Sequence, residues 1–252
     1  MLDKITCVIP TRNRPELAFR AILSVFKTGY ESLEVVVVDD ASESKFVLPQ
    51  DFVYRDHVRI VRVEHQVGGA VARNIGIDLS SGAFICFLDD DDELLPNKFD
   101  LMLPPLLASH SIDAVVAECI LVDVLSGTTV NCSNPDFSGI RNAIKNRIHT
   151  NATLIKRRVI ESLRFNEKLA KFQDTQFNTD LCFKYNVLHL NVPVAKWYTN
   201  HGAGQITTQK GLFFSSKNYC ELVMHFACST KISFYYLYEH VFRMLYLFIR
   251  LK

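Results

Sequence analysis

The chain has 252 residues, of which 48% are hydrophobic and 22% charged, a composition typical of a globular protein and not of a disordered one. The net charge is only +1, which argues against a nucleic-acid-binding protein, because such proteins usually carry a strongly basic surface. No stretch reaches the roughly 18 uncharged apolar residues expected of a membrane-spanning helix, and the N-terminus does not resemble a signal peptide. The seven cysteines form no CxxC pair, so we expect reduced thiols in a cytoplasmic protein and no structural zinc.

The first hundred residues alternate between strand-like and helix-like segments. Apolar and β-branched runs predict strands at residues 5–10, 33–38, 58–63 and 84–88. Apolar residues at helical spacing predict helices at residues 14–26 and 69–79. This β-α-β-β-α-β order predicts an α/β fold with helices on both sides of a sheet.

The pattern after residue 96 is less regular. A helix is predicted at residues 97–107, although Pro104 and Pro105 should kink or end it. Strands are predicted at residues 113–124 and 150–155, and helices at 157–163 and 173–185. Since no linker or repeat interrupts the chain, we expect one domain over residues 1–230, with a donor-binding half at 1–100 and an acceptor-binding half at 101–230.

Three polar clusters follow the apolar runs. They are Thr11-Arg12-Asn13, Asp39-Asp40, and the four acids of FLDDDDELLP, which are Asp89, Asp90, Asp91 and Asp92. In open α/β sheets, ligands bind beyond the carboxyl ends of the strands. Because all three clusters are expected at that edge, they predict one shared ligand site.

The four acids have two interpretations. Hard divalent cations such as Mg²⁺ and Mn²⁺ prefer carboxylate ligands, and a cation would offset the repulsion between neighbouring charges. The alternative is an exposed helix start, where Asp is favoured as a cap. We assign Asp92 to such a helix start and the acids before it to the ligand.

Further candidates are weaker on chemistry alone. Asp39 and Asp40 either accept hydrogen bonds from a ligand or end a strand in a turn. Gly69 and Arg73 open a predicted helix, where a backbone and a cation could approach phosphate, although paired glycines also form plain turns.

Two more residues remain open between a site and a structural role. Asp174 precedes a predicted helix and could be either its cap or a general base. His201 lies in the polar stretch HGAGQITTQ, which is either a lid that supplies a metal or phosphate ligand or a surface loop.

The tail, residues 231–252, has a wide apolar helical face and basic residues. This pattern predicts an amphipathic C-terminal helix that lies on a membrane surface. A helix packed on the core, or a homodimer contact, is the alternative.

Four segments together resemble the family-2 glycosyltransferases of the GT-A fold. They are VIPTRNR, VVVVDDAS, GGAVARNIGIDLSSGAFICFLDDDD and NEKLAKFQD. The resemblance implies a Rossmann-like nucleotide-binding fold with a mixed central sheet flanked by helices. It also implies a metal-dependent inverting transferase that uses Mn²⁺ or Mg²⁺.

The resemblance implies a role for each matching residue. Asp40, with Asp39 beside it, would recognise the uracil of a UDP-sugar, and Thr11 and Arg12 would border the base. Arg73 would lie near the diphosphate. The family's DxD motif matches Asp89 and Asp91, with Asp90 as the spacer at the nucleotide-sugar. Asp91 would be the direct metal ligand, joined by Asp89. His201 is a further candidate ligand, from its place in the polar stretch and not from the resemblance.

The same resemblance assigns the catalytic base to Asp174. It matches the aspartate of the family's ED motif, although Gln173 stands where the family has Glu. An acceptor hydroxyl deprotonated by Asp174 would attack the sugar from the face opposite the diphosphate and invert the anomeric centre.

The implied function is transfer of a hexose from UDP-Glc, UDP-Gal or an N-acetyl derivative to a lipid-diphosphate-linked saccharide, such as an undecaprenyl diphosphate saccharide. A β-glycosidic bond of O-antigen or another surface polysaccharide would result, at the cytoplasmic face of the bacterial inner membrane. Two alternatives remain: a polyprenyl-phosphate glycosyltransferase, and an inactive nucleotide-sugar-binding subunit.

Overall fold

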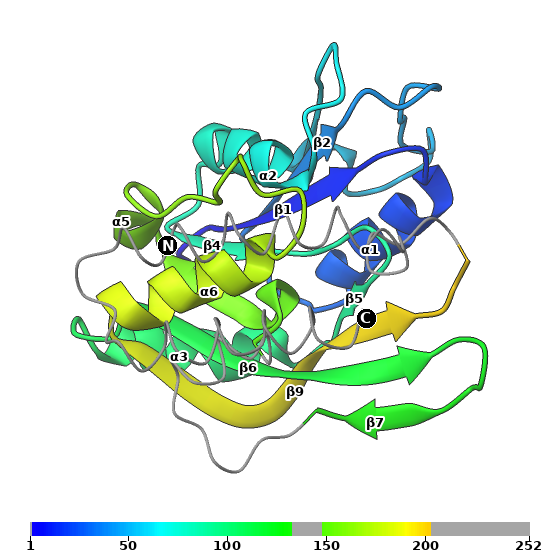
Figure 1. Cartoon of the computed structure of the whole chain (residues 1–252). Helices are drawn as coiled ribbons and strands as arrows, with labels where there is room; N and C mark the ends of the chain where they lie inside the picture. The colour runs from blue at the N-terminus through cyan, green and yellow to red at the C-terminus, as the bar shows by residue number, and fades with distance from the viewer. Residues whose placement is uncertain (1, 133–147, 203–252) are drawn as a thin grey trace, which may run out of the picture.

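One mixed β-sheet organises the part of the chain that the structure describes. The computed structural model describes residues 2–132 and 148–202. Within these ranges the strand order is β3-β2-β1-β4-β8-β6-β9-β5, and β7 pairs with β6 (Figure 1). The strands are β1 (Ile5–Thr11), β2 (Leu33–Asp39), β3 (Val58–Arg62), β4 (Phe84–Phe87), β5 (Glu93–Leu94), β6 (Ala114–Asp123), β7 (Thr129–Asn131), β8 (Thr153–Lys156) and β9 (Val187–Thr199).

The N-terminal half of the sheet is parallel. Strands β3, β2, β1 and β4 run in one direction, as their apolar runs predict. Strand β2 has the sequence LEVVVVD, and its four valines are all fully buried. Such a run forms a strand because helices cover both of its faces.

The second half of the sheet mixes strand directions. Strand β8 is antiparallel to both β4 and β6, β9 is parallel to β6, and β5 is antiparallel to β9. The expectation of a mixed sheet between helices is therefore confirmed.

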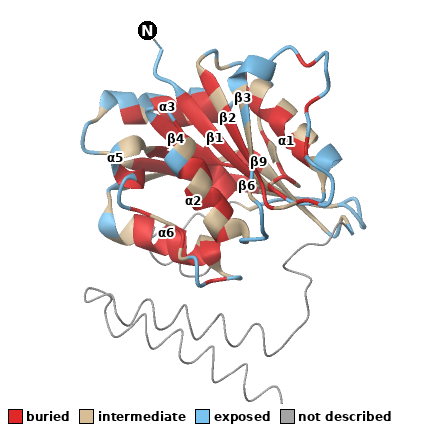
Figure 2. Cartoon of the chain, turned by 90° about the horizontal axis from the view of Figure 1, so that it is seen from above, coloured by how far each residue is buried: buried red, intermediate tan, exposed pale blue. Residues whose placement is uncertain are grey.

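Helices cover both faces of this sheet. The helices are α1 (Pro15–Phe26), α2 (Gly69–Leu79), α3 (Lys98–Ala108), α5 (Arg157–Ile160) and α6 (Gln173–Lys184), with 3-10 turns η1 (Arg55–His57) and η2 (Thr150–Ala152). Apolar residues of α1 and α3 join one core cluster, and those of α2, α5 and α6 join the core on the other face. Figure 2 shows these buried residues along the strands and the inner sides of the helices.

Helix α2 lies very close to β1. A Cβ atom at Gly76 would meet Val8 Cγ1 at 2.2 Å, so only glycine allows this approach. The close contact fixes the first turn of α2, which carries Arg73, relative to the carboxyl end of β1.

Pro104 and Pro105 do not end the third helix, which is one of the two effects that the sequence predicts. Helix α3 continues through Pro104 and Pro105 to Ala108. Pro104 is exposed and Pro105 is half-buried, whereas Met102, Leu103 and Leu106 are buried. The carbonyls that lose their amide partners can therefore face solvent, while the opposite side of the helix stays packed.

Strand β9 and the β6–β7 pairing are absent from the sequence prediction. Asn191 and Pro193 interrupt the alternation of β9, and the pairing with β6 shifts register between Val116 and Cys119. The predicted helix at residues 231–252 lies outside the described residues. Within the described ranges, no helix has the length and apolar character needed to cross a membrane.

Candidate active site

The turn after β4 carries the four aspartates, and each of them contacts residues from other elements. Asp90 is buried and accepts a hydrogen bond from Thr11 Oγ1 at 2.7 Å. Arg14 clamps it with Nη2 at 2.6 Å and Nε at 3.1 Å. Burial and the charges of Asp91 and Asp89 nevertheless raise the pKa of Asp90 to about 7, against the opposing charge of Arg14.

Asp91 contacts Arg14 and His201 at a partly exposed position of the turn. Its Oδ2 lies 3.0 Å from Arg14 Nη1 and 3.0 Å from His201 Nε2. The Asp91 and His201 side chains are 15% and 10% exposed. Two residues 110 positions apart, both expected to bind metal, therefore meet at the carboxyl edge of the sheet.

Asp89 faces the first turn of α2. Its carboxylate pairs with Arg73, and its backbone N–H donates to Asn151 Oδ1 at 3.0 Å. Burial alone would raise the pKa of Asp89, but the positive charge of Arg73 and its hydrogen bond to the carboxylate outweigh burial and lower it. Asp89 is therefore held as a carboxylate.

Asp92 does not start a helix, and its assignment as a helix-start acid is wrong. It is 1% exposed, and the next helix, α3, begins six residues later at Lys98. Its Oδ2 accepts from Asn151 Nδ2 at 2.5 Å, and its Oδ1 accepts from the Tyr198 N–H at 2.8 Å. Burial and the charges of Asp89 and Asp91 raise its pKa well above the usual range.

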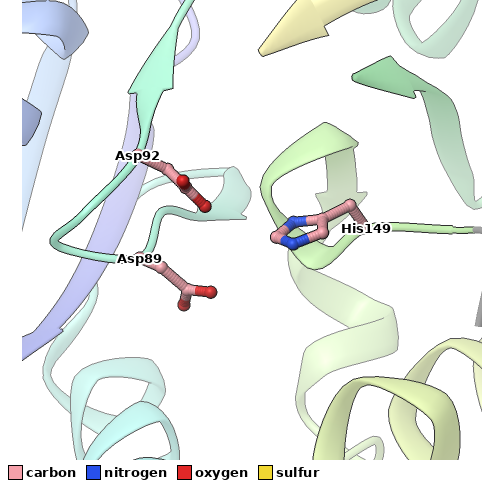
Figure 3. A group of neighbouring side chains, drawn as sticks. All are labelled: Asp89, Asp92 and His149. Carbon is pink, nitrogen blue, oxygen red and sulfur yellow. The ribbon is translucent and has the colours of Figure 1, made fainter. Parts of the chain in front are cut away.

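A second group of possible metal-ligand atoms shares Asp89 with the contacts described above. In the described ranges, Asp89, Asp92 and His149 form a group whose ligand atoms all lie within 4.8 Å of one another. Figure 3 shows the His149 ring pointing toward the two carboxylates from the opposite segment. Carboxylate and imidazole are donors that Mn²⁺ accepts, so the donor chemistry around this turn fits a divalent cation.

Arg73 connects the acid turn to α6. Its Nη1 donates to Gln173 Oε1 at 3.0 Å, and its other terminal nitrogen pairs with Asp89. Burial would lower the pKa of Arg73, but the charges of Asp89 and Asp174 outweigh it and raise that pKa. The half-buried Asp174 therefore stands within electrostatic reach of the arginine that also holds Asp89.

Gln173 suits this position as an amide. While its oxygen accepts from Arg73, its Nε2 donates to the Leu169 carbonyl at 2.9 Å. A glutamate carboxylate could not make that second bond. A Cβ atom at Gly69 would lie 3.0 Å from Arg73 Nη1 and 3.2 Å from Gln173 Oε1, so Gly69 leaves space for the pair.

Asp39 and Asp40 lie at the same edge, and both are already hydrogen-bonded. Asp39 is fully buried and accepts from the Ser42 and Phe46 N–H groups at 2.9 and 3.3 Å. Asp40 accepts from the Val67 and Gly68 N–H groups at 2.6 and 3.0 Å. Asp39 therefore shapes the loop after β2, and Asp40 fixes the loop that leads into α2.

The structure brings most of the expected site residues to one edge of the sheet. Thr11, Arg73, Asp89 to Asp91, Gln173 and His201 join through the contacts above, whereas Arg12 is exposed at the end of β1. Sequence reasoning missed Arg14, Asn151 and His149. Arg14 could have been found from its place just after β1, but nothing in the sequence links residues 149–151 to the acids.

The chain is similar to known glycosyltransferases. The family model described as glycosyl transferase family 2 matches residues 6–161. WcaA of Escherichia coli, whose name places it in colanic acid biosynthesis, is 38% identical over 101 residues, which are 39% of this chain and 36% of that protein. The GalNAc(5)-diNAcBac-PP-undecaprenol beta-1,3-glucosyltransferase of Campylobacter jejuni is 30% identical over 48% of this chain and 39% of its own length. The chain thus covers less than half of either relative.

A solved structure extends the similarity in fold. The TarS 1–349 structure of S. aureus in complex with UDP-GlcNAc matches with a TM-score of 0.75 at 16% identity, over 94% of this chain and 71% of that chain. This similarity shows that the chain has the GT-A fold.

We predict that Asp39→Asn lowers the stability of the fold. The amide would turn an NH₂ group toward one of two buried backbone donors, which leaves that donor without an acceptor. We expect the free energy of unfolding to fall by about 1–3 kcal/mol, measured by urea unfolding. Asp51→Asn, at an exposed acid, is the control and should change nothing; an unchanged Asp39→Asn would refute the structural role of this carboxylate.

Proposed function

The chain belongs to glycosyl transferase family 2, and from this membership we propose that it transfers a hexose from a UDP-sugar to a hydroxyl of a lipid-diphosphate-linked saccharide. The donor would be UDP-Glc, UDP-Gal or an N-acetyl derivative. The observation that carries the proposal is the meeting of Arg73, Asp89, Asp91 and Asp174 at one edge of the sheet. The product would be a β-glycoside of O-antigen or another surface polysaccharide.

The donor site is proposed at the ends of β1 and β2 and at the start of α2. Asp40 would receive the N–H of the uracil, with Thr11 and Arg12 beside the base and Gly69 at the diphosphate. Arg73 lies one turn inside the N-terminus of α2, and the backbone amides and helix dipole at that N-terminus also favour phosphate. The TarS complex with UDP-GlcNAc supports a UDP-sugar in this fold.

The acid turn would hold a divalent cation, Mn²⁺ or Mg²⁺. Asp91 and His201 are the proposed ligands, together with Asp89, because these three side chains are partly exposed, whereas Asp92 is only 1% exposed. A bound cation would act as a Lewis acid that neutralises the charge of the diphosphate leaving group. Arg73 supplies a second positive charge to the same group.

Asp174 is the proposed general base. It would remove the proton from the acceptor hydroxyl, which then attacks C1 of the sugar from the face opposite the diphosphate. One displacement breaks the C1–O bond to the diphosphate and inverts the anomeric centre. Gln173 stands where the family has Glu, and it still accepts a hydrogen bond from Arg73. The positive charge of Arg73 therefore stays in the site.

The acceptor is proposed to be lipid-linked, on the strength of the Campylobacter relative, whose name includes an undecaprenol-linked acceptor. The reaction would then occur at the cytoplasmic face of a bacterial inner membrane. Residues 231–252, which we predict to bind that surface or a second copy of the chain, lie outside the described residues.

We predict that UDP-sugars stabilise the chain, and more so with Mn²⁺. A ligand at 100 times its Kd adds about 2.7 kcal/mol, which corresponds to a rise in Tm of roughly 5–11 °C for a domain of this size. A thermal-shift screen of UDP-, GDP- and dTDP-sugars with Mn²⁺ or EDTA measures it. GDP- and dTDP-sugars are the controls, and no shift with any UDP-sugar would refute the proposed function.

We predict that Asp174→Asn lowers kcat for sugar transfer by about 100-fold to 10,000-fold, because the acceptor proton loses its base. The Kd for UDP should stay within about twofold, since Asp174 is assigned to the acceptor. Transfer is measured with a radiolabelled donor. Near-normal kcat would instead favour polyprenyl phosphate as acceptor, because a phosphate nucleophile needs no base.

We predict that His201→Ala abolishes most of the Mn²⁺-dependent gain in UDP affinity, a loss of at least about tenfold. His149→Ala should have the smaller effect, because His149 is not one of the proposed ligands and forms a separate group with Asp89 and Asp92. Isothermal titration with UDP, with and without Mn²⁺, compares both variants with the exposed control His110→Ala. If only His149→Ala loses the Mn²⁺-dependent gain in UDP affinity, the cation binds instead at the group formed by Asp89, Asp92 and His149 (Figure 3).

A further inference from the structure

Asn151 contacts all three members of the group formed by Asp89, Asp92 and His149. It lies in η2 and is fully buried. Its Oδ1 accepts from the Asp89 N–H at 3.0 Å, and its Nδ2 donates to Asp92 Oδ2 at 2.5 Å. Its own N–H donates to His149 Nδ1 at 3.4 Å.

A buried lysine fixes Asn151 from the core side. Lys98, at the start of α3, is fully buried and donates from Nζ to the Asn151 carbonyl at 2.7 Å and to the Thr153 carbonyl at 3.2 Å. Every polar group of Asn151 therefore has a partner. The residue cannot rotate without breaking a buried hydrogen bond, which costs about 1–3 kcal/mol.

The oxygen and the nitrogen of the Asn151 side-chain amide have opposite hydrogen-bonding roles. The oxygen must accept from the Asp89 N–H, and the nitrogen must donate to the Asp92 carboxylate, whose other oxygen accepts from the Tyr198 N–H. A row of hydrogen bonds thus runs from the start of the acid turn, through Asn151 and Asp92, to β9. His201, which faces Asp91, follows Tyr198 by three residues.

We propose that Asn151 is a positioning residue for the donor site: it orients the acid turn so that Asp89 and Asp91 face the cation and the diphosphate. This proposal rests on the proposed function, since it assigns a role within the same site. Groups that orient metal-binding side chains typically change metal affinity by about 10-fold to 100-fold when they are removed. We expect an effect of that size on the Mn²⁺-dependent affinity for UDP.

The first test is Asn151→Asp in the full chain. The new carboxylate keeps the acceptor for the Asp89 N–H but faces Asp92 without a donor. The Kd for UDP in Mn²⁺, measured by isothermal titration, should rise by about 10-fold to 100-fold. The Kd for UDP in EDTA should stay within about twofold of the parent, because the residues proposed to bind the uracil, and Arg73, are unchanged.

The second test reverses the middle hydrogen bond. In the double variant Asn151→Asp with Asp92→Asn, the amide at 92 can donate to the carboxylate at 151 and still accept from the Tyr198 N–H. This exchange should restore the Kd for UDP in Mn²⁺ to within about threefold of the parent. The double variant restores all the hydrogen bonds of residues 92 and 151. It therefore still tests the positioning role if Asn151→Asp alone fails to fold.

The control is Thr6→Val, which removes buried hydrogen bonds at the opposite end of β1. Thr6 Oγ1 donates to Glu34 at 2.5 Å and accepts from the Gly82 N–H at 2.8 Å. This variant should lower Tm yet leave the Kd for UDP in Mn²⁺ unchanged.

The outcomes separate the two proposals. If the parent chain binds UDP with Mn²⁺ and Asn151→Asp binds it equally well, or if the exchange restores Tm but not affinity, the positioning role is refuted and the function stands. If the parent chain shows no Mn²⁺-dependent binding of UDP, the proposed function fails, and the role of Asn151 fails with it.

Discussion

Four consecutive carboxylates in a largely buried turn all need partners for their charge, and the rest of the site is arranged around that requirement. Burial and the neighbouring charges of Asp91 and Asp89 raise the pKa of Asp90 to about 7 against the opposing charge of Arg14. The partners come from different elements: Arg14 precedes α1, Arg73 belongs to α2, Asn151 to η2, and His201 follows β9. The turn is therefore the point at which both halves of the sheet meet.

The sequence was sufficient to predict the parallel half of the sheet and the identity of the acid turn. Runs such as LEVVVVD and the polar residues that follow them are local signals, and the predicted strands and helices of residues 5–88 are confirmed within a residue or two. Strand β9 and the Asp92–Asn151 contact were not predictable in this way. Both depend on residues far apart in the chain, 59 positions in the second case. Hydrophobic periodicity is a local signal and does not predict such distant contacts.

Two residues beside Arg73 hold its guanidinium group in place. Gln173, in place of glutamate, keeps a hydrogen bond to Arg73 and gains one to the Leu169 carbonyl. Gly69 leaves the space in which Arg73 and Gln173 meet. An amide and a missing side chain thus keep Arg73 beside the acid turn, while Asp174, next to Gln173, stays half-buried.

The short strand β5 gives the acid turn a mechanical role. β4 and β5 follow one another in the chain, yet β8, β6 and β9 lie between them in the sheet. Four strand spacings in a flat sheet would cover about 19 Å, close to the full reach of a connection of this length. The turn is folded back by the hydrogen bond from the Asp92 N–H to the Asp89 carbonyl, so the sheet has to curl for β5 to reach β9. The short acid turn therefore restricts how flat this part of the sheet can be, and a change in the length of the turn would change the curvature of the sheet around β5 and β9.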